Sequence, residues 1–351
     1  MRRTIFTIIA LCLALVSTVC GCTRNQTGTE NEVNVYNRGR YIDKGIFERF
    51  EKETGIRVNY FERRGNEDIA SLMKKGDANM DVVFLSDYMV AHMIDEGLLE
   101  QLNLSHIPNY DLIDDKYMNL EYDPECKYSV AYMTGTAGLI YNSALIPDEP
   151  TGWSALFDDR YAGQILMFDN PRDTFGIALK CLGYHHNTVD ENHIREAYEL
   201  LSLQKPLIQA YVMEEIYDAM EAGGAAVGPY YAGDYISMRR TNPALRFVRP
   251  VEGATWFVDA MCIPKGARNM SNAEVFINYL CRTEIALLNM DAVMYASANF
   301  EAAEVFRGQL DSVDQEIVFA SYETIYSYGA FTRIPVEIQA VYDELWAQLR
   351  Q

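Results

Sequence analysis

Short apolar runs alternate with amphipathic stretches along much of this 351-residue sequence, and this alternation constrains the fold more than any other feature. Apolar residues at 33–36, 56–61 and 81–85 are separated by segments with helical periodicity at about 45–53 and 67–75. Strands that alternate with helices in this way are typical of βαβ units with parallel strand pairing. We therefore predict an α/β unit in the first third of the chain.

The same alternation returns later in the sequence. Strands are predicted at 163–168, 206–210 and 225–228, with helices at 173–182 and 212–222 between them. About 320 residues follow residue 32, which is more than one hydrophobic core usually serves. The sequence therefore predicts two α/β lobes, and the last clear element is a helix at 336–349.

Two extended apolar segments, at 130–142 and 255–264, are expected to cross between the lobes. A small ligand would then bind in the cleft at the carboxyl ends of the strands, and the lobes would close on it about the crossings. The expected division is 33–137 with 259–303 for lobe 1, and 138–258 with 304–351 for lobe 2.

The first residues have the form of a signal peptide. Arg2 and Arg3 precede an apolar run at 5–19, and small residues follow in Val19-Cys20-Gly21-Cys22. This ending resembles a lipobox, so residues 1–21 are predicted to be removed and Cys22 to carry the lipid anchor. Ordinary secretion without a lipid is the alternative, and export is expected in both cases. The polar segment 22–32 is expected to be a flexible tether.

Composition excludes several classes of function. The chain has 30 basic and 50 acidic residues, a formal net charge of -20, so nucleic acid is not an expected partner. Outside the leader, the cysteines show no CxxC or Cys/His cluster, so neither a metal site nor a cofactor is predicted. One disulfide is possible, and buried free thiols are the other reading. These cysteines are Cys126, Cys181, Cys262 and Cys281.

Motifs of common enzymes are not found in the sequence. It has no Gly-x-Ser-x-Gly, no His-Glu-x-x-His and no phosphate-binding loop. A binding protein is therefore expected rather than an enzyme, with a secreted hydrolase as a distant alternative.

Several segments together resemble the spermidine/putrescine-binding proteins of polyamine ABC importers. The resemblance covers nearly all of the chain after the tether and is carried by 35–37 with 41–42, 50–56, 81–88, 169–173 and 256–259. It implies a two-lobed type II periplasmic-binding-protein fold, with a mixed, mostly parallel sheet flanked by helices in each lobe. It also implies a monomer without a cofactor, facing the periplasm or the extracellular space, that delivers a polyamine to a membrane permease.

An extended diammonium ligand needs carboxylates for its charged ends and aromatic faces for its methylenes. The resemblance suggests the carboxylates Asp87, Asp173 and Asp259. Asp87 and Asp173 could instead cap helices, Asp259 could make a structural hydrogen bond, and the aromatic residues could simply fill the core. The remaining candidate ligand-binding residues are Arg38, Tyr41, Ser86, Tyr88, Tyr231, Phe257 and Tyr295.

Arg38 and Arg40 depart from the family pattern, which has a Trp and an acid at these positions. A fixed cation about 4 Å from an amine would cost about 4 kcal/mol at an effective dielectric constant of ~20. Either both arginines pair with surface acids outside the cleft, or they bind a carboxylate-bearing solute in place of a polyamine. Further departures are Thr134, Asn170, Tyr231 and Phe331.

Overall fold

The structure is a computed structural model that describes residues 31–76 and 79–351. The predicted signal peptide, the predicted lipid attachment site at Cys22 and most of the predicted tether lie outside these described residues.

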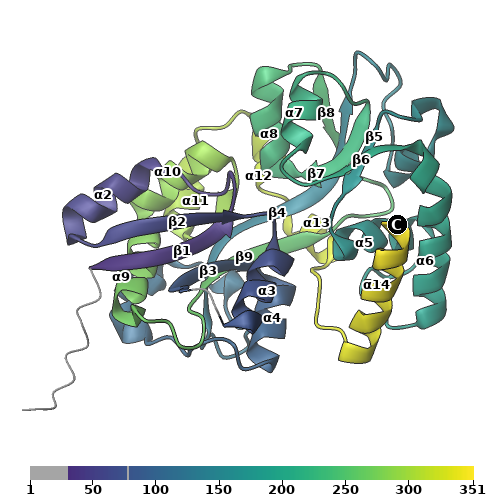
Figure 1. The fold of residues 1–351 in the computed structure, drawn as a ribbon. Helices are drawn as coiled ribbons and strands as arrows, with labels where there is room; N and C mark the ends of the chain where they lie inside the picture. Colours follow the sequence, from purple (N-terminus) through teal and green to yellow (C-terminus); the bar gives the residue numbers. More distant parts are fainter. Residues whose placement is uncertain (1–30, 77–78) are drawn as a thin grey trace, which may run out of the picture.

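The amino-terminal part forms the predicted α/β unit (Figure 1). Strand β1 pairs in parallel with both β2 and β3. Helix α2 ends at Gly55, whose φ of 71° is left-handed and whose N–H donates to the carbonyl of Glu51. The elements are β1 (Glu32–Arg38), α2 (Gly45–Thr54), β2 (Arg57–Arg63), α3 (Asn66–Lys75), β3 (Val82–Ser86) and α4 (Asp87–Asp95).

The two predicted crossings are neighbouring strands. Strand β4 (Ser129–Asn142) and strand β9 (Trp256–Cys262) pair antiparallel, and they run between the two halves of the molecule in Figure 1. Strand β9 also pairs with β3, while β4 pairs with β7 and β8. They join the strands into one ten-stranded mixed sheet with the order β2-β1-β3-β9-β4-β7-β5-β6, to which β8 and β10 are added beside β4.

The second half repeats the alternation of strands and helices, with β5 parallel to both β6 and β7. The predicted start of a helix at Val212 is wrong, because Val212 pairs with Phe168 at the end of β6. The helix begins at Ile216. The elements are β5 (Ile165–Phe168), α5 (Pro171–Cys181), α6 (Glu191–Gln204), β6 (Ile208–Val212), α7 (Ile216–Glu221), β7 (Val227–Tyr231), α8 (Ala232–Thr241) and β8 (Leu245–Val248).

The carboxyl-terminal helices and strand pack against both halves of the molecule. The final helix α14 (Val336–Leu349) has the predicted bounds and buries Leu345 and Leu349. The others are α9 (Met270–Leu280), α10 (Thr283–Val293), β10 (Ala296–Ser297), α11 (Phe300–Arg307), α12 (Ser312–Val318) and α13 (Tyr322–Tyr328). Short 3-10 helices lie at Leu104–His106, Pro108–Leu112, Asp115–Tyr117, Trp153–Phe157, Asp159–Tyr161 and Lys205–Leu207.

Alternation along β3 divides the core of the first half. Val82 and Phe84 pack with α2 and α9, whereas Val83 and Leu85 pack with α3 and α4 on the other face of the sheet. A separate core of the second half surrounds Phe168. Helix α10 contributes side chains to the cores of both halves, so its packing does not assign it to one lobe. The residue boundaries predicted for the two lobes therefore remain a prediction.

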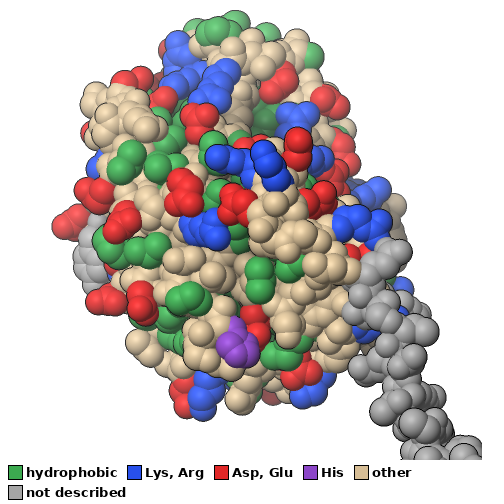
Figure 2. Space-filling model, turned by 90° about the vertical axis from the view of Figure 1, so that its left-hand side faces the viewer, with side chains coloured by type: hydrophobic (Ala, Val, Ile, Leu, Met, Phe, Trp, Pro, Cys, Tyr) green, Lys and Arg blue, Asp and Glu red, His purple; other side chains and the backbone are tan. Residues whose placement is uncertain are grey.

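On the face in Figure 2, acidic and basic side chains are interspersed. The four cysteines of the described residues are unpaired. Within residues 31–76 and 79–351, no cluster of His, Cys, Asp and Glu could hold a metal ion. None of the helices in these ranges has the length and apolar character needed to cross a membrane.

Candidate functional site

One cavity lies where the carboxyl ends of β1 and β3 face those of β5, β6 and β7. It contains about 760 Å³ of space not filled by protein atoms, part of it open to solvent. All ten predicted ligand-binding residues line it: Arg38, Tyr41, Ser86, Asp87, Tyr88, Asp173, Tyr231, Phe257, Asp259 and Tyr295. Whether they hold a ligand stays a prediction, but the fold brings them together around one space.

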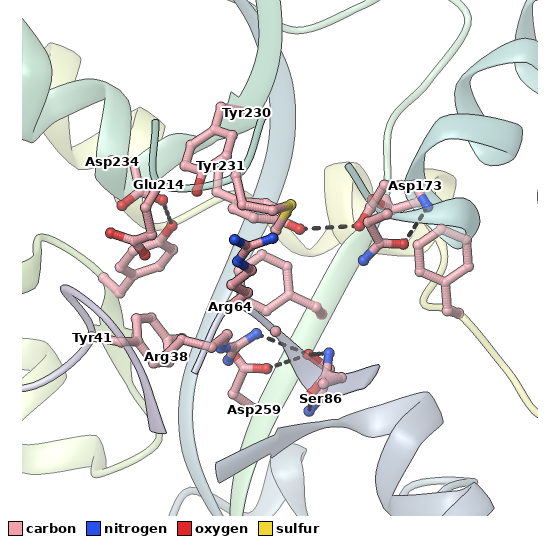
Figure 3. Close-up of a pocket in the computed structure, with 18 of the residues that line it drawn as sticks. Arg38, Tyr41, Arg64, Ser86, Asp173, Glu214, Tyr230, Tyr231, Asp234 and Asp259 are labelled. Atoms are coloured by element: carbon pink, nitrogen blue, oxygen red, sulfur yellow. Dashed lines mark hydrogen bonds and ion pairs between the residues drawn. The ribbon is translucent and has the colours of Figure 1, made fainter. Parts of the chain in front are cut away.

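Arg38 and Asp259 form an ion pair in the wall of this cavity (Figure 3). Nη2 of Arg38, at the end of β1, lies 2.6 Å from Oδ2 of Asp259 on β9. Asp259 also accepts hydrogen bonds from the hydroxyls of Tyr41 and Ser86, each at 2.6 Å. Its side chain is only 1% exposed, and that of Arg38 is 16% exposed. The sequence alternative in which Arg38 pairs with an acid outside the cleft is therefore wrong.

A guanidinium at this place stays charged. Burial alone would lower the pKa of Arg38, but the negative charge of Asp259, the hydrogen bond to Asp259 and the nearby tyrosines Tyr41 and Tyr231 together more than offset this effect, so the pKa is raised. Nη1 of Arg38 donates to the hydroxyl of Ser86 at 3.2 Å, and the guanidinium carbon lies 4.7 Å from the ring centre of Tyr41. Arg38 is thus held by a carboxylate, a hydroxyl and an aromatic ring.

Asp173 lies in another part of the cavity wall, in the first turn of α5. Its carboxylate accepts a hydrogen bond from Tyr231 at 3.0 Å, and burial raises its pKa to about 7. Asn170, rather than Asp173, is the N-cap residue, because its side chain accepts the backbone N–H of Asp173. The helix-capping alternative for Asp173 is therefore wrong.

Glu214 and Asp234 form a pair of neighbouring carboxylates that the sequence analysis missed. Asp234 accepts hydrogen bonds from Tyr217, at 2.6 Å, and from Tyr295. Burial, together with the negative charge of Asp234, raises the pKa of Glu214 to about 7. Burial raises the pKa of Asp234 to about 6 despite its two tyrosine donors. In Figure 3 this pair lies on the opposite side of the cavity from Asp173.

Asp87 is the most deeply buried of the carboxyl groups that have a raised pKa here. It is the first residue of α4, with Ser86 as the N-cap residue. Its oxygens accept the backbone N–H groups of Tyr88, at 2.7 Å, and Val258, at 3.2 Å. Burial raises its pKa to about 8. Asp87 is therefore not the N-cap, although it accepts one amide of the first helical turn.

Aromatic rings line the space between these carboxylates. The ring of Phe257 lies 5.3 Å from that of Tyr231 and 6.1 Å from that of Tyr295. Tyr295 fits because Gly135 and Gly233 are small: a Cβ atom would lie 2.9 Å from its ring at Gly135 and 2.5 Å at Gly233. Tyr295 lines the cavity and also belongs to the hydrophobic core. The two roles considered for the aromatic residues, filling the core and lining the cavity, are therefore compatible.

The remaining departures from the family pattern have separate positions. Asn170 and Phe331 line the cavity, and exposed Arg40 lies at its edge with its guanidinium carbon 4.3 Å from the ring centre of Tyr217. Thr134 is not among the lining residues. Its hydroxyl instead donates to the backbone carbonyl of Phe257 at 2.7 Å.

The sequence did contain a signal for Glu214 and Asp234, the two carboxylates that the sequence analysis missed. Asp87 and Asp173 both lie in the first turn of a helix that follows a strand, and Asp234 has the same position after β7. Glu214 follows the end of β6 at Val212, an end concealed by the incorrect helix prediction. Carboxyl ends of parallel strands are the usual places for ligand-binding side chains.

Comparison with known proteins identifies relatives across almost the whole chain. Residues 45–313 match the family model for bacterial extracellular solute-binding proteins. A spermidine/putrescine-binding periplasmic protein of Salmonella typhimurium is 29% identical over 96% of this chain and 97% of its own length. Its counterpart numbered 1 in Haemophilus influenzae is 31% identical over 80% of this chain and 79% of its own.

Solved structures have the same fold. A Listeria monocytogenes protein assigned to a spermidine/putrescine ABC transporter is 33% identical, with a TM-score of 0.86 over 92% of this chain and 99% of its own. The spermidine/putrescine ABC transporter substrate-binding protein of Streptococcus pneumoniae is 30% identical, with a TM-score of 0.75 over 91% and 98%. These neighbours confirm the predicted two-lobed type II architecture.

Proposed function

This chain belongs to the family of bacterial extracellular solute-binding proteins, and from that premise we propose that it captures a polyamine in its cavity and delivers it to the permease of an ABC importer. The named relatives bind spermidine or putrescine. The chemistry of the cavity supports extending this ligand class to the present chain.

The observation that carries the proposal is a set of carboxylates, Asp173 buried and Glu214 and Asp234 half-buried, that form no ion pair within the described part of the chain. Asp173, Glu214 and Asp234 form no ion pair with any basic side chain in residues 31–76 and 79–351. Buried charges are normally paired, since the loss of hydration is costly. A ligand with ammonium groups would supply the missing charge.

The arrangement fits an extended diamine in particular. One ammonium group would bind Asp173 and the other the Glu214 and Asp234 pair on the opposite side of the cavity (Figure 3). Tyr231 and Phe257 would cover the methylenes between them. Charge-assisted hydrogen bonds and cation–π contacts would then hold both ends.

We further propose that the protein binds its ligand without chemical turnover and acts as a monomer without a cofactor. An organic cation would be released intact to the permease. Recovery of a hydrolysed product after incubation with any ligand of the cavity would contradict this part of the proposal and revive the hydrolase alternative.

Anchoring to the membrane is a separate proposal that rests on the sequence near Cys22. Acylation of this cysteine after removal of residues 1–21 would hold the binding domain at the outer surface of the membrane. The chain would then face the periplasm or the extracellular space.

Thermal unfolding and small-angle X-ray scattering test the transport role together. Ligands that bind only the folded state raise the melting temperature by mass action, and closure of the lobes reduces the radius of gyration. We expect both effects with putrescine or spermidine, and neither with small dicarboxylates. A response to carboxylates alone would replace the polyamine by an acidic solute.

A further inference from the structure

Three groups of acidic side chains in the cavity could each hold a cation, and one of them already does. We call them the Asp173 site, the Asp234 site, which consists of Glu214 and Asp234, and the Asp259 site. We propose that Arg38 permanently fills the Asp259 site in place of a ligand amine, so that the protein selects diamines over triamines. This inference rests on the proposed function and narrows its ligand class.

The contacts of Arg38 are those that an alkylammonium group would make. Asp259 supplies a carboxylate at 2.6 Å, Ser86 a hydroxyl at 3.2 Å, and Tyr41 an aromatic ring at 4.7 Å. Charge-assisted hydrogen bonds to a carboxylate and contact with an aromatic face are general means of binding an organic cation. The guanidinium thus uses the chemistry that an amine at this position would need.

The carboxylate of Asp259 already accepts three donors, one of them the cation of Arg38. Its Oδ2 atom accepts Arg38 and the Tyr41 hydroxyl, and its Oδ1 atom accepts the Ser86 hydroxyl at 2.6 Å. The side chain is 1% exposed. An amine arriving there would have to displace an arginine that is attached to the protein and therefore present at high effective concentration.

Displacement would also place two cations side by side. A displaced guanidinium that stayed in the cavity would repel the incoming ammonium group at short range. The Asp173 and Asp234 sites have no such competitor, since neither is ion-paired within the described residues. Two sites remain for ligand charges, which matches a dication such as putrescine.

The test measures affinity for putrescine and spermidine by calorimetry on wild type and variants of the mature protein freed of bound ligand. Wild type should bind putrescine at least tenfold more tightly than spermidine. The Arg38→Ala substitution should reduce this preference at least tenfold by improving spermidine binding, because Asp259 becomes available to a third ammonium group. Arg38→Met, which keeps an unbranched stem without the charge, provides a second variant if the first does not fold.

Two controls separate a vacated site from a change in overall charge. Arg64→Ala removes another arginine of the cavity lining, an exposed one, and should leave the putrescine-to-spermidine ratio within about twofold of wild type. Adding Asp259→Asn to Arg38→Ala should abolish the gain for spermidine. An equal gain in Arg64→Ala, or a gain that persists without Asp259, would overturn the inference.

Failure of the inference and failure of the proposed function give different results. If wild type binds putrescine but Arg38→Ala and Arg38→Met leave the ratio unchanged, Arg38 is not a selectivity determinant. The same conclusion follows if wild type binds both amines equally. If wild type binds no amine, the proposed function itself is wrong.

Discussion

Nη2 of Arg38 lies 2.6 Å from Oδ2 of Asp259, and this contact joins the end of β1 to β9, one of the two strands that run between the halves of the molecule. The pair is part of the cavity wall and is also part of the interior. Its removal should therefore change the stability of the protein as well as its ligand selectivity.

Replacing Asp259 by Asn should lower the free energy of unfolding by about 3 kcal/mol, because the charge of Arg38 would stay largely buried without a counter-ion. Urea denaturation of the ligand-free protein measures this loss. Glu53→Gln provides the matched control, since Glu53 pairs with Arg282 at 2.7 Å on the surface and should contribute less than about 1 kcal/mol. Equal effects of the two substitutions would show that burial of the Asp259 pair has no energetic importance.

Replacing Tyr231 by Phe should weaken putrescine binding about five- to thirtyfold, as expected for the loss of one donor to a buried carboxylate. The ring that covers the ligand would remain, but Asp173 would lose its hydrogen bond at 3.0 Å. Calorimetric titration measures the change. Tyr184→Phe, which removes an exposed hydroxyl bonded to Glu196, should leave the affinity unchanged. An unaltered affinity in Tyr231→Phe would remove Asp173 from the proposed site.

Diamine affinity should increase as the pH rises from about 6 to 8. The pKa is about 7 for Asp173 and Glu214 and about 6 for Asp234, so these groups are partly protonated near neutral pH. A bound dication favours their ionised forms and lowers these pKa values, so binding releases protons. The ammonium groups, with a pKa near 10.4 in lysine, stay charged throughout.

The expected change is about tenfold or more between pH 6 and pH 8, since up to three carboxyl groups must ionise. Titrations in buffers with different ionisation enthalpies count the released protons directly. Constant affinity over this range, with no proton release, would mean that these carboxylates do not contact the ligand.

Replacing Cys22 by Ala should release the protein from the membrane. The proposed acyl chains are attached at this residue, so the variant would lose the proposed attachment to the bilayer. Fractionation of cells that express each form, together with labelling by a radioactive fatty acid, measures the effect. Cys20→Ala should remain labelled and bound. Labelling that persists in Cys22→Ala would place the lipid elsewhere.

Asp87 and Asp173 are cavity-lining residues that could be predicted from the sequence. The family resemblance suggested both as site residues. Each follows an apolar strand of a βα unit, and because such strands end at one edge of a sheet, their position in the cavity lining agrees with that suggestion. Glu214 was missed for an equally local reason. Helical periodicity around Val212 concealed the end of strand β6, whose limit is set by pairing with β5.

The partner of Arg38 could not be predicted in this way. Its neighbours in the sequence carry no signal for Asp259, and the pair exists because β1, β3 and β9 are adjacent in the sheet. Sequence comparison could identify Arg38 as unusual for its family, but only the tertiary structure assigns its charge to a carboxylate within the cavity.

The central claim is that unpaired carboxylates of the cavity bind an organic dication. It is tested most directly by calorimetric titration of putrescine into wild-type protein and the Asp173→Asn variant, after bound ligands are removed by unfolding and refolding. We predict saturable binding of one putrescine per chain to wild type and an affinity at least a hundredfold lower in the variant, as expected for a lost buried charge pair of about 3 kcal/mol. No binding to wild type, or equal binding to both proteins, would contradict the claim.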